Sequence, residues 1–159
     1  MDQRTPAQQI LRAKEYLTVA ADPAALNDQI RVMPAVYFDI AMLKAQVDAQ
    51  IATLKGQQAQ TKNLLTAAEA RVWRDCRGQT NPATGKPFSE KDMEKGEEGL
   101  DPEIQSLIRD LGETGVEIGK QEAVSKMYYD LLVALKDASD ICQRIYGNQA
   151  VERAMASRT

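Results

Sequence analysis

The fold of this 159-residue chain is decided by residues 34–77, which read PAVYFDIAMLKAQVDAQIATLKGQQAQTKNLLTAAEARVWRDCR. Pro34 suits the first turn of a helix, where the N–H that proline lacks has no partner, and the next proline is Pro82. Apolar residues recur at steps of three and four, among them Leu43, Leu54 and Leu65, as in an amphipathic helix. At about 1.5 Å per residue the stretch predicts one helix of roughly 66 Å, which needs another helix along its apolar face.

The first 33 residues predict two short helices. Thr5, Pro6 and Gln8 form a capping-box pattern at the start of the first helix. Asp22 and Pro23 begin the second, which is expected to end before Pro34 because the residue before a proline resists helical geometry. These helices either lie beside the base of the long helix or form an arm that orders only in an assembly.

A loop is expected at about residues 78–100, where glycines and prolines follow in close succession. Its turn chemistry is compatible with a small hairpin around Thr84 to Lys86 and with a capped turn at residues 89–92. Asp101 and Pro102 then begin the return segment.

The return segment contains three glycines, Gly112, Gly115 and Gly119. On a continuous helix they would form one smooth face, but each costs about 1 kcal/mol against alanine, and we favour a break or a flexible joint there. From Gln121 a heptad seam follows, which Gly147 is expected to end, leaving a short last helix or a frayed tail. Three further residues widen this seam: Met127, Leu132 and Ile141.

The predicted fold class is therefore all-α: an elongated antiparallel helical hairpin over residues 34–159, with short N-terminal helices over residues 1–33. Two helices enclose little volume, so we expect the hairpins to share an oligomeric bundle or ring. The core and oligomerisation residues that this predicts are Leu43, Leu54, Leu65, Val124, Tyr128, Leu131, Leu135 and Ile145. From periodicity alone, a purely structural coiled oligomer is the better interpretation of this architecture.

Composition argues against several classes of protein. The chain has no histidine, the commonest general base and transition-metal ligand, so we expect no enzyme and no cofactor; a site of carboxylates around a hard metal is the alternative. Cys76 and Cys142 are isolated, which favours ordinary residues over a metal site or a disulfide. No run of about 18 apolar residues and no signal-peptide layout occur, so no membrane contact and a cytoplasmic location are expected, in the host cytoplasm if a phage encodes the chain.

The net charge of −3 hides a polarity along the sequence. Residues 71–88 carry four basic side chains against one acid, a sum of +3, whereas residues 97–122 carry eight acids against two basic residues, a sum of −6. The basic side chains lie at the end of the long helix and in the loop after it: Arg71, Arg74, Arg77 and Lys86. Cations suit the C-terminal end of a helix dipole, so these arginines also have a purely structural explanation.

An aromatic residue, Trp73, lies among these arginines, and Phe88 follows across the loop. Arginines interleaved with an aromatic ring are the pattern of single-stranded nucleic-acid binding, because phosphates take the charge and bases stack on the ring. Arg71, Trp73, Arg74, Arg77 and Lys86 are therefore candidate contacts. The alternative is that Trp73 belongs to the core. A ring that repeats the patch would provide an electrostatic path for a strand.

The order of these features resembles that of the UvsY-type recombination mediators of T-even-like phages, over roughly residues 26–154. In both, a long helix with an Ala-Arg pair in its basic end leads to a glycine, a polar loop, an acidic middle and a Tyr-x-x-Leu-Leu helix. The matching residues here are Ala70, Arg71 and Gly78; then Tyr128, Leu131 and Leu132, or Tyr129, Leu132 and Val133; then Ile145 and Gly147. The family has a lysine where this chain has Glu69, and a tyrosine pair where it has Trp73, Arg74 and Asp75.

The resemblance implies a homo-oligomer that binds single-stranded DNA, displaces or remodels the single-strand-binding protein and loads a RecA-like recombinase. It carries the DNA contact over to Arg71, whereas Arg74 and Arg77 are candidates by charge. The competing classes are a phage or bacterial assembly scaffold, and a small inhibitor that binds a host protein through its acidic region.

Overall fold

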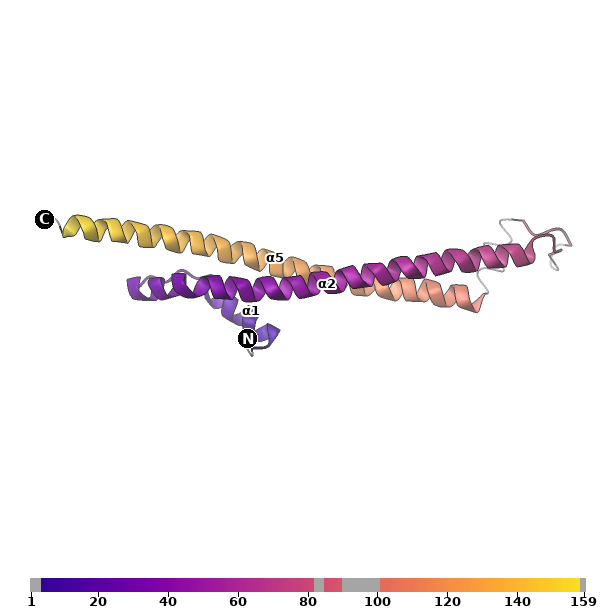
Figure 1. Cartoon of the computed structure of the whole chain (residues 1–159), viewed down its shortest axis with the longest axis horizontal. Helices are drawn as coiled ribbons and strands as arrows, with labels where there is room; N and C mark the ends of the chain where they lie inside the picture. The colour runs from indigo at the N-terminus through magenta and orange to yellow at the C-terminus, as the bar shows by residue number, and fades with distance from the viewer. Residues whose placement is uncertain (1–3, 82–84, 90–100, 158–159) are drawn as a thin grey trace. The chain divides into compact units, whose positions relative to one another are not determined.

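A computed structural model describes residues 4–81, 85–89 and 101–157, and these ranges contain α1 (Pro6–Glu15), α2 (Pro23–Cys76) and α5 (Pro102–Ala156) (Figure 1). The predicted all-α class is confirmed, since β-pairing in the described ranges is limited to one bridge, Thr80 with Pro87. The chain forms two compact units. Unit 1 is Met1–Ala49 with Glu122–Thr159, and unit 2 is Gln50–Gln121. No helix in the described ranges is apolar over a length that would cross a membrane.

Helix α1 begins as its sequence predicts. The Thr5 hydroxyl accepts a hydrogen bond from the Gln8 amide at 3.4 Å, and the Gln8 side chain accepts one from the Thr5 amide at 2.9 Å. This reciprocal capping box satisfies backbone donors that have no partner inside the helix.

Helix α2 does not start at Pro34, as the sequence predicted; it starts at Pro23 and runs through Pro34 without a break. The Asp22 carboxylate accepts from the Ala25 amide and caps this earlier start. Pro34 removes one helical hydrogen bond, at a cost of about 3 kcal/mol. Burial of Leu26 and Met33, worth about 1.5 to 3 kcal/mol each, offsets that cost on the inner face. The predicted second short helix and the boundary at residue 33 are therefore wrong.

The break expected at the three glycines is also wrong, because α5 is one helix of 55 residues. Ile118, between Gly115 and Gly119, is buried, so the inner face keeps its packing through this stretch. A Cβ at Gly115 would lie 3.6 Å from the Gln58 side chain, an ordinary contact, and one at Gly112 or Gly119 would meet nothing. The glycines lower the stability of the helix but do not end it.

Gly147 does not end α5, which continues to Ala156. The helix start is as predicted, since the Asp101 carboxylate accepts from the amides of Glu103 and Ile104 at 2.8 and 3.1 Å. The loop predicted at residues 78–100 follows the end of α2 at Cys76. The small hairpin expected around Thr84 to Lys86 and the capped turn expected at Ser89 to Asp92 each include residues outside the described ranges.

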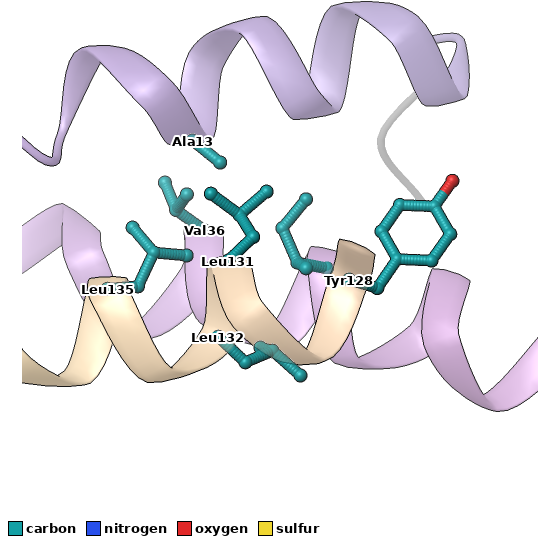
Figure 2. Packing of buried hydrophobic residues seen from close by; sticks show 7 residues of the cluster. Ala13, Val36, Tyr128, Leu131, Leu132 and Leu135 are labelled. Carbon is teal, nitrogen blue, oxygen red and sulfur yellow. The ribbon is translucent and has the colours of Figure 1, made fainter. Parts of the chain in front are cut away.

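The core of unit 1 is closed by three helices of the same chain. Ala13 of α1, Ile40 of α2 and Leu135 of α5 are at most 1% exposed. Figure 2 shows Ala13 pointing from α1 toward Val36 and Leu131. Around Leu131 and Leu135, α1 therefore covers part of the seam that we expected neighbouring subunits to cover.

The predicted core residues fare unevenly. Tyr128, Leu131 and Leu135 are buried in this cluster, as is Leu132, and Leu43 packs against it. Of the others, Ile145 packs on a second cluster of unit 1, Leu65 packs in unit 2, Leu54 is partly buried, and Val124 is exposed. Met127 and Ile141, expected to widen the seam, are exposed as well.

A single buried glutamine holds the connection between α1 and α2. Gln29 is 7% exposed; its Nε2 donates to the carbonyls of Tyr16 and Thr18 at 3.0 and 2.9 Å, and its Oε1 accepts from the Ala20 amide at 2.9 Å. One side chain therefore pairs three backbone groups of a segment that has no regular structure.

Unit 2 has a smaller core near the end of α2. Ala68, Val72 and Ile104 are buried there, and Phe88 and Leu107 pack against them. Nearer the middle of α2, the partly buried positions of the inner face are occupied by the polar residues Gln58 and Thr61.

Replacement of Gly112 or Gly119 by alanine tests the continuity of α5. Each change should raise the free energy of unfolding by about 0.5 to 1 kcal/mol, because alanine has less freedom to lose and its Cβ meets no atom. Gly78→Ala is the control and should destabilise, since Gly78 has a φ of 85°. Urea titration measures all three, and a loss of stability in both helix variants would contradict a continuous α5.

Gln29→Ala should lower the free energy of unfolding by about 1 to 3 kcal/mol, because it strands buried backbone groups without partners. Asn27→Ala, an exposed change on the same helix, should stay within about 0.5 kcal/mol of the unchanged protein. Equal effects of the two changes in urea titration would show that the glutamine does not hold the α1 connection.

Candidate nucleic-acid interface

The basic patch predicted from the sequence lies in unit 2, where α2 ends and the loop begins. Gly78 adopts a φ of 85°, a left-handed conformation that favours glycine, and terminates the helix two residues after Cys76. The Gln79 amide donates to the Cys76 carbonyl at 3.0 Å, and the Gln79 side chain donates to the Asp75 carbonyl at 2.6 Å. These bonds pair carbonyls that a helix end leaves open.

Packing fixes which side chains of this helix end point outward. Val72 is buried and Cys76 is partly buried, so both face the core of unit 2. Because successive helical residues turn by about 100°, Arg74 lies about 200° from Val72, on the opposite side of the helix, and Arg77 follows directly after the last residue of α2. Both arginines are exposed.

Trp73 is the aromatic residue of this patch, and it does not belong to the core. Its side chain flanks the outward face about 100° from Arg74 and is 40% exposed, whereas the adjacent Val72 is 8% exposed. The indole is therefore accessible to a base, as stacking requires.

The two arginines beside Trp73 have few partners. The Arg74 Nε donates to the Ala70 carbonyl at 3.2 Å, which directs the guanidinium toward the preceding turn of α2. Within the described residues, the Arg77 side chain makes no hydrogen bond or ion pair. Most of the donor groups on these two guanidinium ions therefore point to solvent.

Arg71, the position at which the family resemblance implies a DNA contact, is already engaged. Its Nη1 donates to Glu103 Oε2 at 2.7 Å, and its Nη2 lies 3.4 Å from Asp101 Oδ2. The hydrogen bond to Glu103 and the charges of both carboxylates raise the pKa of Arg71 above its ordinary value. A phosphate would have to displace or join these carboxylates to reach the guanidinium.

Lys86 and Phe88, which the sequence placed near the patch, have different surroundings. The Lys86 carbonyl accepts from the Asn81 amide at 2.8 Å inside the turn bridged by Thr80 and Pro87, and the lysine is exposed. Phe88 instead packs on the buried cluster of unit 2 and anchors the loop to it. It is a structural residue.

The patch is less positive than its sequence suggests. Residues 71–88 sum to +3, but Asp101 and Glu103 lie against Arg71 and lower the local sum to +1. The pKa of Asp101 is lowered, chiefly because the Ile104 amide donates to its carboxylate, so this group is ionised at neutral pH. Sequence reasoning missed both acids as partners, because they lie 30 and 32 residues beyond the arginine that they neutralise.

The arrangement offers exposed cations and an exposed aromatic ring. Within the described residues no group of three or more histidine, cysteine or acidic side chains forms a metal-binding cluster. Burial in unit 1 raises the pKa of the Cys142 thiol, as expected of an ordinary core residue. Comparison of the chain with protein-family models, with curated proteins and with solved structures finds no match.

Proposed function

We propose that this protein is a non-enzymatic recombination mediator, which binds single-stranded DNA as a homo-oligomer and helps load a RecA-like recombinase onto DNA covered by single-strand-binding protein. The observation that carries the proposal is the exposed indole of Trp73 beside two exposed arginines at the end of α2. Arg74 and Arg77 take phosphates in this proposal, and Trp73 stacks on a base. The resemblance to the UvsY-type family supports the later steps, which involve the recombinase and the single-strand-binding protein.

Self-association is the second part of the proposal, and the exposed side of α2 in unit 1 favours it. Five apolar residues recur there at steps of three and four and are all exposed; we call them the outer face: Ala35, Phe38, Met42, Ala45 and Ala49. This is the spacing of a helix–helix seam, although α5 already packs on the other side of α2.

The outer face also alternates in size in a way that fits a second copy of itself. An antiparallel pair of α2 helices with a two-fold axis between residues 43 and 44 places Phe38 against Ala49 of the partner subunit. The same axis places Met42 against Ala45 of the partner subunit. Each large side chain then meets a small one, and the contact is the same on both subunits.

An assembly scaffold is the alternative that the outer face also favours, since it needs self-association and no nucleic acid. The inhibitor alternative depends on the acidic segment, residues 97–122, whose exposed acids in the described part are Glu103, Asp110, Glu113 and Glu122. Strand binding separates both alternatives from a mediator.

A DNA titration with exchanged patch residues tests the mediator proposal. Arg74→Ala and Arg77→Ala should each weaken binding to labelled oligothymidylate and oligodeoxyadenylate alike, and should flatten the salt dependence by roughly 0.7 for each phosphate that is no longer bound. Trp73→Ala should cost about 1 to 3 kcal/mol per stacked base, whereas Trp73→Phe should keep most of the affinity. Fluorescence anisotropy at several salt concentrations measures both quantities.

Lys62→Ala is the matched control for this titration, since it removes an exposed cation of α2 outside the patch. It should leave the salt dependence close to that of the unchanged protein. Absence of salt-sensitive binding to single-stranded DNA at low ionic strength would refute the mediator proposal and leave the scaffold.

Solution mass tests the outer face. The unchanged protein should have a mass that is a multiple of 17.6 kDa, and the double change Phe38→Ser with Met42→Ser should reduce it to that of one chain with the helical circular dichroism retained. Leu11→Ser, which changes an exposed leucine of α1, should leave the mass unaltered. A folded, unchanged protein that sediments as a monomer at tens of micromolar would contradict self-association.

A further inference from the structure

We propose that Glu103 and Asp101, at the start of α5, restrain the DNA-binding patch by occupying Arg71 in place of a phosphate. This inference rests on the proposed strand binding and concerns the regulation of that same site. The two carboxylates act as competitors for the guanidinium, so that Arg71 joins the interface when a strand displaces them.

The geometry of the contact supports competition. Glu103 Oε2 lies 2.7 Å from Arg71 Nη1, a charge-assisted hydrogen bond of the kind that a phosphate oxygen makes with arginine. Asp101 Oδ2 lies 3.4 Å from Nη2, so two acids address two nitrogens of one planar group. The Arg71 side chain nevertheless keeps 46% of its surface exposed, which leaves it open to a ligand in solution.

The two acids have separable roles. Asp101 uses its Oδ1 to cap α5 and its Oδ2 to approach Arg71, so its position follows from the start of the helix. Glu103 makes no cap, and its side chain is 55% exposed, so its carboxylate is the movable part of the pair. Exposed ion pairs are weak, and a phosphate is able to exchange with one.

Such a contact gives the patch a graded response to its ligand. Trp73, Arg74 and Arg77 are open in the absence of DNA, and they suffice for a first, weak contact. Arg71 adds to that contact only after Glu103 has moved away. A protein that must hold a strand and then release it to another protein benefits from a cation that is returned to an internal acid on release.

A double-mutant cycle on the full chain tests the inference, with oligothymidylate as the probe. Glu103→Gln should tighten binding by about two- to fivefold, the range expected for an exposed ion pair, and should steepen the salt dependence by roughly 0.7 for one additional bound phosphate. In an Arg71→Ala background the same change should have no effect, because the released group is absent. Arg71→Ala alone should weaken binding less than Arg74→Ala does.

Glu113→Gln is the control, since it removes an equal charge from an exposed position of the same helix. The inference is overturned if Glu113→Gln tightens binding as much as Glu103→Gln, because bulk charge then explains the tighter binding, or if the effect of Glu103→Gln persists without Arg71. DNA binding by the unchanged protein with no effect of Glu103→Gln also overturns it and leaves the proposed function standing. No binding by either protein overturns both. Melting temperatures of all variants identify an effect that comes from altered folding.

Discussion

The contact of Ala13 with Val36 and Leu131 is the constraint on which unit 1 depends. Leu131 and Leu135 lie on a stripe of α5 that is wider than α2 covers, and a third helix has to pack there. A small residue at position 13 lets α1 pack closely on α2 and α5. Gln29 holds the connection between α1 and α2 through its hydrogen bonds. Because the chain closes this core by itself, the core does not require self-association, and the proposed self-association depends on the outer face of α2.

Local signals in the sequence located the helix starts at Thr5 and Asp101, because a cap is a contact between residues two or three positions apart. The same local reasoning failed at Pro34 and at the glycines of α5. That reasoning took account of helix propensity, which amounts to a few kcal/mol. It left out the free energy gained by burying residues such as Met33 and Ile118, which pack along the inner faces. Where a long inner face stays packed, propensity alone does not end a helix.

The candidate interface was predictable to the extent that it depends on helical phase. Once Val72 faces inward, Arg74 must face outward, and the spacing in the sequence is enough to say so. The pairing of Arg71 with Glu103 was not predictable, since 32 residues separate the two and no local pattern links them. The acidic segment was recognised as a charge, but its first described residues act as partners of the basic patch.

The exposed aromatic residues carry the functional argument further than the charges do. The chain has two phenylalanines and one tryptophan, and it leaves Phe38 and Trp73 exposed in a protein with few large core residues. Burial of such side chains stabilises a fold by about 1.5 to 3 kcal/mol each, so the isolated chain forgoes that stabilisation at both positions. Both lie on α2 away from the inner faces, where α5 already packs, and neither belongs to a buried cluster. Partners that cover Phe38 and Trp73 would recover this stabilisation. In the proposed function, a second copy of the chain covers Phe38 and a DNA base covers Trp73.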